Sequence, residues 1–126
     1  MKVIAYKIDP QQKEYLVRAN AKVHELTFIS NDLTDDTLSY AAGKEVIVLN
    51  DLRTVNGSLL DKLKYFGIGI LIGRSGPPSP ALSVHAHELG LKIISLDPAL
   101  SEKNIAEKII QAFQYEGTFQ KVNKRI

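Results

Sequence analysis

Short apolar runs and amphipathic segments alternate along the 126 residues of this chain. Five of the runs are rich in β-branched and other apolar residues, and the segments between them repeat apolar residues at helical spacing. Residues 45–49 contain a continuous apolar run, which is typical of a strand buried on both faces. The pattern predicts strands at residues 2–6, 24–29, 45–49, 68–72 and 91–96.

Residues that cap helices stand where the predicted helices begin. Asp9, Pro10 and Gln12 have the spacing of an N-cap, a first helical residue and a capping-box partner. Glycine just beyond an apolar helical stripe marks a helix end. The same reasoning places further helix starts at Thr34, Asn56, Ser79-Pro80 and Ser101, and helix ends at Gly67 and Gly90.

Five strands that alternate with helices predict a parallel sheet covered by helices on both faces. We expect an α/β flavodoxin-like sandwich with strand order 2-1-3-4-5, as a single domain over residues 1–126. The basic residues at 117–126 are expected to form a frayed tail. In such sheets ligands bind beyond the carboxyl ends of the strands, so site residues are sought there.

Composition removes several classes of function. The chain has no cysteine, which excludes disulfides, a thiolate nucleophile and a cysteine metal site. Its net charge of +2, together with a basic end, residues 121–126, that offers no aromatic platform, gives no reason to expect nucleic acid as a partner. The sequence has no apolar run long enough to span a membrane and no signal-peptide pattern, so we expect a cytoplasmic protein without membrane contact.

Four segments match, in order, motifs of one enzyme family. Met1-Lys2-Val3-Ile4-Ala5-Tyr6 is similar to the first strand of D-lactate dehydrogenases. Gly73-Arg74-Ser75-Gly76, and then Glu88-Leu89-Gly90 with Leu91-Lys92-Ile93-Ile94, resemble their fourth strand, substrate loop, helix and fifth strand. Asn104-Ile105-Ala106-Glu107 resembles the family's Asn-Ala-Ile-Ala-Glu helix. The chain therefore resembles the N-terminal substrate domain of the NAD-dependent D-2-hydroxyacid dehydrogenases over essentially its whole length.

The resemblance implies that the cofactor is bound elsewhere. In this family a second, inserted domain binds NAD and supplies the catalytic Arg, Glu and His, and this chain stops where that domain would begin. We therefore expect no cofactor, no catalytic residue and no dehydrogenase activity from this chain alone. Its nearest glycine cluster, Gly67-Ile68-Gly69 with Gly73, flanks a predicted strand instead of following it. That placement indicates a helix cap and strand ends, not a dinucleotide-binding turn.

Three parts of the implied substrate site depart from the family pattern. The family's substrate loop holds a carboxylate with backbone N–H groups, but here Pro77 and Pro78 remove two of these donors. The segment Asp97-Pro98-Ala99-Leu100-Ser101 lacks the tyrosine that the resemblance implies. Lys108 stands where the crossover motif usually continues to His. These departures indicate that the catalytic constraint has been lost.

The leading interpretation is a stand-alone, non-catalytic module that binds a small anion, such as a 2-hydroxy or 2-oxo acid, or that regulates through it. The expected ligand-binding residues are Arg74, Ser75 and Gly76 with Asp51 and Arg53 of the loop Asn50-Asp51-Leu52-Arg53. One alternative is a protein-interaction subunit, including a homodimer, because loss of a cofactor domain uncovers a face. Another is one half of a split NAD-dependent enzyme.

Other groupings give weaker signals. His85 and His87 lie two apart on a predicted helix and point to different faces, so with Glu88 they make a poor metal site, and no metal is expected. Asp9 and Asp51 stand near strand ends as acidic residues do in phosphoacceptor receiver domains, but the fifth strand is not followed by the lysine that those domains use. Gly73-Arg74-Ser75-Gly76 does not match the nucleophile turn of hydrolases.

Overall fold

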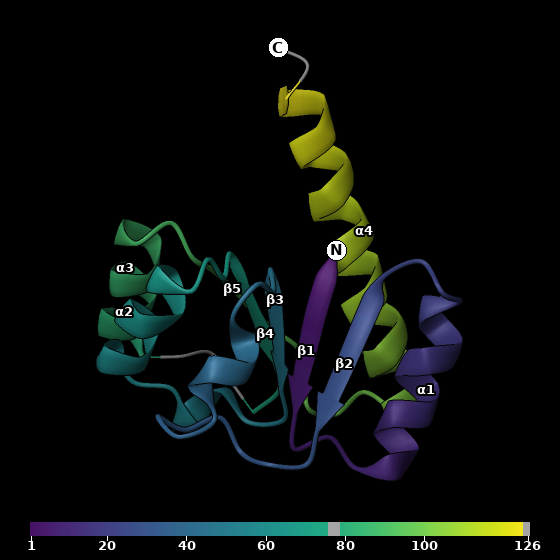
Figure 1. Cartoon of the computed structure of the whole chain (residues 1–126). Coiled ribbons are helices and arrows are strands. Elements are labelled where there is room, and N and C mark those ends of the chain that lie inside the picture. The colour runs from purple at the N-terminus through teal and green to yellow at the C-terminus, as the bar shows by residue number, and fades with distance from the viewer. Residues whose placement is uncertain (76–78, 125–126) are drawn as a thin grey trace.

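The five predicted strands form one parallel sheet with the order β2-β1-β3-β4-β5, which confirms the flavodoxin-like prediction (Figure 1). The structure is a computed structural model that describes residues 1–75 and 79–124, with side chains described as far as Phe113 in the last helix. The strands are β1 (Lys2–Tyr6), β2 (Glu25–Ile29), β3 (Val46–Leu49), β4 (Ile70–Gly73) and β5 (Lys92–Ser95). The helices are α1 (Pro10–Asn20), α2 (Gly57–Tyr65), α3 (Pro80–Glu88) and α4 (Glu102–Lys124), with short 3₁₀ helices η1 (Leu38–Ala41) and η2 (Leu52–Thr54).

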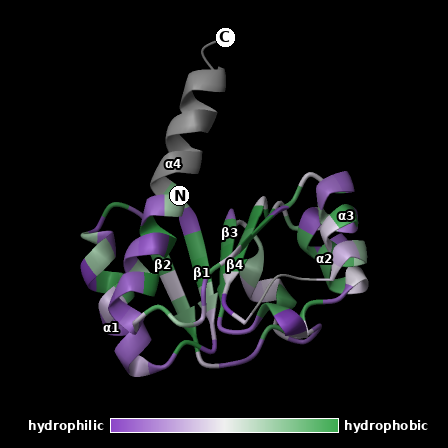
Figure 2. Ribbon diagram, turned by 180° about the vertical axis from the view of Figure 1, so that it is seen from behind, coloured by the Kyte–Doolittle hydropathy of each residue, from purple (hydrophilic) through white to green (hydrophobic). Residues whose placement is uncertain are grey.

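Helices cover both faces of the sheet and create two separate hydrophobic cores. Successive side chains of a strand point to opposite faces. Val3 and Ala5 of β1 therefore face α1 and α4, whereas Ile4 and Tyr6 face α2, α3 and η1. Figure 2 shows the result, with hydrophobic central strands between helices whose outer faces are polar. In the described part of the chain, no helix is long and apolar enough to cross a membrane.

The predicted helix caps are confirmed at four helix starts. In α1 the Gln12 backbone N donates to Asp9 Oδ1 at 2.9 Å, while the Asp9 backbone N donates to Gln12 Oε1 at 3.1 Å. Because both bonds satisfy backbone donors that a helix start leaves open, the sequence Asp-Pro-Gln-Gln fixes where α1 begins. Asn56, Ser79 and Ser101 each accept from the backbone N three residues later, and Gly67 and Gly90 follow α2 and α3 with φ of 89° and 76°.

The connection between β2 and β3 differs from the prediction. Thr34 does not cap a helix there. Instead the Thr37 hydroxyl donates to Asp32 O at 2.6 Å and accepts from the Thr34 backbone N at 2.9 Å. These bonds close a turn of their own, so the chain continues into the short 3₁₀ helix η1 and no α-helix forms. The apolar residues Leu38 and Ala41 are still buried, as their spacing predicts.

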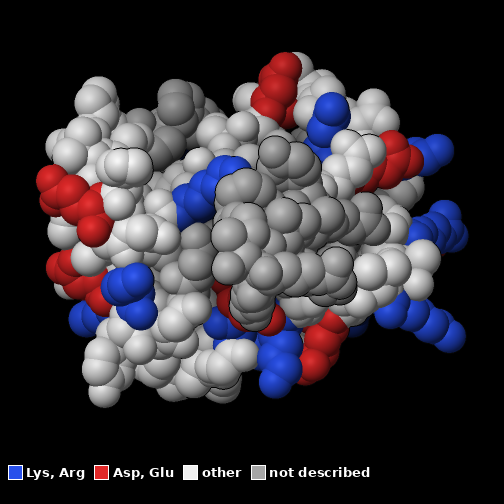
Figure 3. Space-filling model, turned by 90° about the horizontal axis from the view of Figure 1, so that it is seen from above, with Lys and Arg blue, Asp and Glu red and all other residues white. Residues whose placement is uncertain are grey.

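Helix α4 extends past the amino-terminal edge of the sheet (Figure 1). Its apolar stripe, which includes Ile105, Ile109 and Phe113, packs against the sheet and α1. The backbone is helical as far as Lys124, residues 125–126 lie outside the described part of the chain, and fraying of 117–126 stays a prediction. Figure 3, viewed towards this end, shows acidic and basic side chains interspersed among the described residues around α4.

Position 73, the last residue of β4, has to be glycine because β4 lies very close to β3 there. A Cβ at this position would lie 2.5 Å from Leu49 O and 3.2 Å from Leu52 Cδ2. A carbonyl held in a parallel ladder cannot move away cheaply, because β3 and β4 pair here in register. Gly73 therefore sets how closely the ends of β3 and β4 approach, directly before Arg74.

We expect Gly73→Ala to lower the free energy of unfolding by about 1–3 kcal/mol, since overpacking forces the backbone to shift. Gly69→Ala is the matched control, because nothing lies within 4 Å of a Cβ at that glycine. Its effect should be within about 0.5 kcal/mol. Urea unfolding of the two variants checks this, and equal stabilities would contradict the close approach.

His24 is held in a partly buried setting between the chain start and α4. Its Nδ1 lies 3.1 Å from the amino group of Met1, and its ring meets Phe113 edge to face with centroids 5.8 Å apart. The buried Nε2 has no hydrogen-bond partner in the described structure. Burial and the amino terminus lower the pKa of His24 below its ordinary value of 6.5, with Glu45 acting in the opposite direction.

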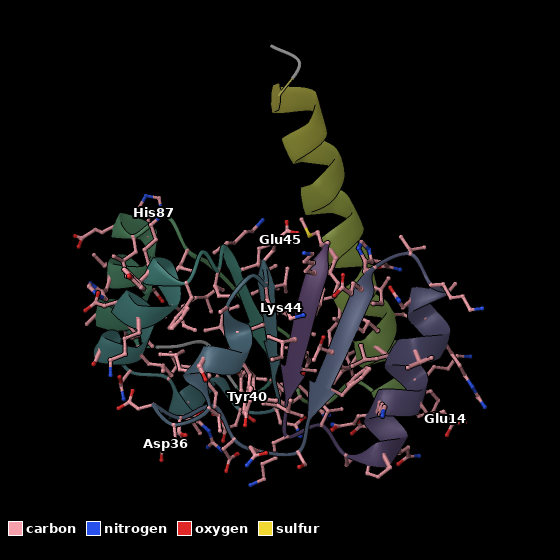
Figure 4. The ribbon with its side chains drawn as sticks, viewed as in Figure 1. Glu14, Asp36, Tyr40, Lys44, Glu45 and His87 are labelled. Carbon is pink, nitrogen blue, oxygen red and sulfur yellow. The ribbon has the colours of Figure 1, made fainter. Side chains whose placement is uncertain are left out.

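Because the folded pKa is lowered, the unfolded chain binds a proton more readily than the folded chain. The stability contributed by neutral His24 is therefore complete above pH 6.5 and is lost as the pH falls below it. We expect His24→Gln to flatten the pH dependence of urea unfolding between about pH 7.5 and about pH 5.5. His87→Gln, at the exposed outer end of α3 (Figure 4), is the control that should keep the wild-type slope. An unchanged slope in the His24 variant would refute this account.

Candidate functional site

A network of polar side chains joins four elements at the carboxyl ends of the central strands. Asn50 follows β3 and pairs with Gln12 of α1: Gln12 Nε2 donates to Asn50 Oδ1 at 3.0 Å, and Asn50 Nδ2 donates to Gln12 Oε1 at 3.2 Å. Asn50 Nδ2 also donates to the backbone carbonyl of Lys7 at 3.1 Å. Gln12 is only 7% exposed, so its amide depends on these partners.

Arg74, the first residue after β4, completes this network with a carboxylate. Its Nη1 and Nη2 donate to the two oxygens of Glu102 at 2.9 and 3.0 Å, and Nη2 also donates to Asn50 Oδ1 at 3.2 Å. The side chains of Arg74 and Glu102 are 16% and 35% exposed. This two-bond arrangement is the geometry in which a guanidinium binds a carboxylate most strongly. Arg74 is thus paired with a carboxylate that the chain itself supplies, and its binding of a ligand anion stays a prediction.

A small cavity adjoins this ion pair. It has a volume of about 20 Å³, which is room for about one water molecule. Four polar side chains of the network contribute to its wall, and the rest is formed by Ile8, by Gly73 of β4 and by apolar residues of α1, β3 and α4. The lining is Ile8, Gln12, Leu16, Val48, Leu49, Asn50, Gly73, Arg74, Glu102, Ile105, Ala106 and Ile109.

A larger surface cleft of about 520 Å³ opens beside the ends of β1, β2 and β3. Its polar groups already have partners: the Tyr6 hydroxyl donates to Thr37 O at 2.9 Å, and Lys7 Nζ lies 3.4 Å from Asp32 Oδ2. Burial, and secondarily Tyr40, raise the pKa of Tyr6 to about 12, so this phenol stays protonated. The cleft therefore offers space next to the network, but its tyrosine does not supply a base.

The predicted residues Asp51 and Arg53 bind each other. Arg53 Nε and Nη2 each donate to one Asp51 oxygen at 3.0 Å, and the Arg53 backbone N donates to Asp51 Oδ1 at 2.9 Å. The side-chain bonds are the main cause that lowers the pKa of Asp51 and raises that of Arg53. Among the described hydrogen bonds, none joins either side chain to the guanidinium of Arg74. The two loops meet instead through the backbone, where Leu52 N donates to Arg74 O at 3.0 Å.

The remaining predicted ligand-binding residues lie at the limit of the described structure. Ser75 has a left-handed backbone with φ of 74°, which turns the chain sharply after Arg74. Gly76, like Pro77 and Pro78, lies outside the described residues.

Two residues of the network were missed by sequence reasoning as site residues. Gln12 is recognisable from its spacing as a capping residue, but its second role as partner of Asn50 depends on the fold. Glu102 is an acidic residue in a first helical turn, where negative charge is ordinary. Glu102 can be recognised as the partner of Arg74 only from the fold, which brings the two side chains together at the end of the sheet.

The histidines of the metal hypothesis lie elsewhere. His85 Nε2 is 2.7 Å from Asp61 Oδ1 on α2, and a Cβ at Gly57 would lie 3.8 Å from His85 Cδ2. Within the described residues no group of three or more His, Asp or Glu side chains is arranged to hold a metal ion.

Comparison with solved structures finds the same fold in part of several dehydrogenases. D-lactate dehydrogenase from Escherichia coli superposes with a TM-score of 0.68 and 27% identity over 76% of this chain. The Salmonella enzyme gives 0.65 and 30% over 80%, and D-lactate dehydrogenase with NAD⁺ from Lactobacillus jensenii gives 0.64 and 19% over 91%. This chain is related to the D-2-hydroxyacid dehydrogenases.

The relationship covers a part of these enzymes. The chain spans 31% of the Escherichia coli and Salmonella enzymes and 35% of the Lactobacillus jensenii enzyme. The resemblance recognised in the sequence motifs is thereby confirmed. No protein-family model matches the sequence, and comparison with curated protein sequences finds no match either.

Because Asn50 bonds Gln12, Arg74 and the Lys7 carbonyl, Asn50→Ala leaves several groups of this dehydrogenase-related domain without partners. We expect a loss of about 1–3 kcal/mol in the free energy of unfolding. Asn31→Ala, at an exposed position in the turn after β2, is the matched control and should change stability by less than about 0.5 kcal/mol. Chemical denaturation measures both, and a loss no larger than that of the control would show that the network contributes little.

Proposed function

We propose that this chain is a non-catalytic domain that binds a small carboxylate of the 2-hydroxy or 2-oxo acid class at Arg74. The observation that carries the proposal is the carboxylate held by both terminal nitrogens of Arg74 beyond the end of β4. A guanidinium that already accommodates one carboxylate in this geometry is shaped to accommodate another.

The position of Arg74 supports the same function. The carboxyl ends of parallel strands are where ligands bind in open α/β sheets, and Arg74 stands there with the carbonyl of Asn50 orienting its Nη2. The surface cleft near Asn50 and Asp51 gives space for the body of a ligand. The related enzymes are named for D-lactate, which is itself a 2-hydroxy acid.

We propose that the chain performs no redox reaction by itself and binds no NAD. In the D-2-hydroxyacid dehydrogenases, as the resemblance implies, the cofactor and the catalytic side chains come from the other domain. Here the glycines near β4 have structural positions: Gly67 follows α2 with φ of 89°, and Gly73 fits against Leu49. Neither forms the turn from a strand into a helix that cradles a pyrophosphate.

The interaction-subunit alternative has less support. Among the described residues, the large apolar side chains that are exposed are dispersed over α1, the loop after it, η1, α2 and α3. They are Val17, Val23, Tyr40, Tyr65 and Val84. Scattered single residues are normal on monomers and do not by themselves mark an interface.

We expect pyruvate, D-lactate and related 2-hydroxy or 2-oxo acids to raise the melting temperature saturably at millimolar concentrations, because they bind the native state. Arg74→Lys keeps the positive charge but loses the planar fork, so the shift should disappear. Arg18→Lys is the matched control and should keep it, because Arg18 lies in the last turn of α1, outside the network, and pairs with Glu14. NADH should give no shift. A clear shift with NADH would overturn the cofactor proposal, and activity on mixing with an NAD-binding subunit would favour the split enzyme.

A further inference from the structure

We propose that Glu102 is a built-in competitor that keeps the carboxylate site of Arg74 closed until a ligand carboxylate replaces it. This inference rests on the proposed function, because it concerns the regulation of the same guanidinium. It makes the contact between α4 and β4 an autoinhibitory one.

The geometry shows why a ligand must compete. Both Nη1 and Nη2 donate to Glu102, and Nη2 donates a second bond to Asn50. The adjoining cavity holds about 20 Å³, which is too small for even a compact organic acid. A carboxylate can therefore form two bonds to the end of this guanidinium only if the carboxylate of Glu102 leaves it.

Glu102 is the partner that can leave. Its side chain is 35% exposed, whereas that of Arg74 is 16% exposed and is also held by Asn50. Rotation of the Glu102 side chain transfers one carboxylate to solvent, but rotation of Arg74 would break bonds to two residues. The ion pair therefore opens most easily from the side of α4.

The start of α4 does not depend on Glu102. Asn104 N donates to Ser101 Oγ at 3.2 Å, and Ile105 N donates to Ser101 O at 2.9 Å. Ile105 and Ala106 are buried against the sheet at 4% and 3% exposure. These contacts hold the first turn in place, so the side chain can swing away while the helix remains docked.

A purely structural role for the pair makes a different prediction. If Glu102 only fastened α4 to the sheet, its removal would lower stability and leave ligand affinity unchanged. If Glu102 is a competitor, the wild type binds the ligand only in the fraction of molecules in which the site is open. Removal of Glu102 then raises the ligand affinity by a factor of one divided by that fraction. A site that is open in about 1–10% of molecules predicts a gain of about 10- to 100-fold.

The experiment is a calorimetric titration of the full chain with acetate, pyruvate and D-lactate. Glu102→Ala removes the competing carboxylate and leaves space for the methyl and carboxylate groups of acetate. Glu102→Gln keeps the size of the side chain and removes its charge. Glu107→Gln, an exposed glutamate on the same helix, is the matched control. The double variant Glu102→Ala with Arg74→Lys tests whether any gained affinity belongs to the guanidinium.

We expect Glu102→Ala and Glu102→Gln to bind these acids at least about 10-fold more tightly than the wild type. The Glu107→Gln control should match the wild type, and the double variant should lose the gain. Acetate should also raise the melting temperature of Glu102→Ala more than that of the wild type. Circular dichroism establishes that each variant is folded.

Two results would overturn the proposals separately. Equal affinities of the wild type and both folded Glu102 variants would refute the role of Glu102 as a competitor but not the carboxylate site at Arg74. No binding to any folded Glu102 variant, although its guanidinium is vacated, would remove the proposed function itself.

Discussion

The partly buried guanidinium of Arg74 is the constraint on which the carboxyl end of this sheet depends. A cation that is 16% exposed is costly unless it is paired and hydrogen-bonded. The fold meets that requirement with groups from three directions: Glu102 from α4, Asn50 from the end of β3 and, through Asn50, Gln12 from α1. Removing one member leaves a buried polar group of another without its partner, so these elements are coupled through polar contacts as well as through the two hydrophobic cores.

Backbone geometry places the guanidinium before any side chain acts on it. β3 and β4 approach so closely at Leu49 and Gly73 that only glycine fits, and the next residue is Arg74. Leu52 N then bonds Arg74 O, which ties the loop after β3 to the loop after β4. The position of the guanidinium is thus set by the strand register and by the absence of a Cβ at Gly73. What the guanidinium binds is set by the side chain that faces it, which here is Glu102.

This division explains how much the sequence could predict. The caps at Asp9, Asn56, Ser79 and Ser101 and the glycine helix ends follow from local spacing, and the strand order was expected from the alternation of strands and helices. All of these are observed. The helix expected after Thr34 does not form, because the Thr37 hydroxyl bonds Asp32 and Thr34 and closes a turn. Helix propensity alone does not predict this turn. Arg74 was recognised from the motif around it. Its partner Glu102 lies 28 residues away and could be found only once β4, β5 and α4 were placed in space. The pairing of Asp51 with Arg53 is local, but the fact that Asp51 binds Arg53 and not Arg74 likewise depends on how the loops are directed.

The location of Glu102 bears on whether its bond to Arg74 can open. It is the first residue of α4, a helix of 23 residues, and unpaired backbone N–H groups give a helix start partial positive charge. A carboxylate there is stabilised by roughly 0.3–1 kcal/mol even when it faces solvent. That stabilisation remains when the carboxylate leaves Arg74, and because the side chain of Glu102 is 35% exposed, it can turn from the ion pair directly into solvent. Arg74, by contrast, has no such second environment, so it needs a replacement anion at the moment Glu102 departs. Under the proposed competition, that asymmetry favours exchange of one carboxylate for another over simple rupture of the pair, and this is why we propose a carboxylate as the ligand.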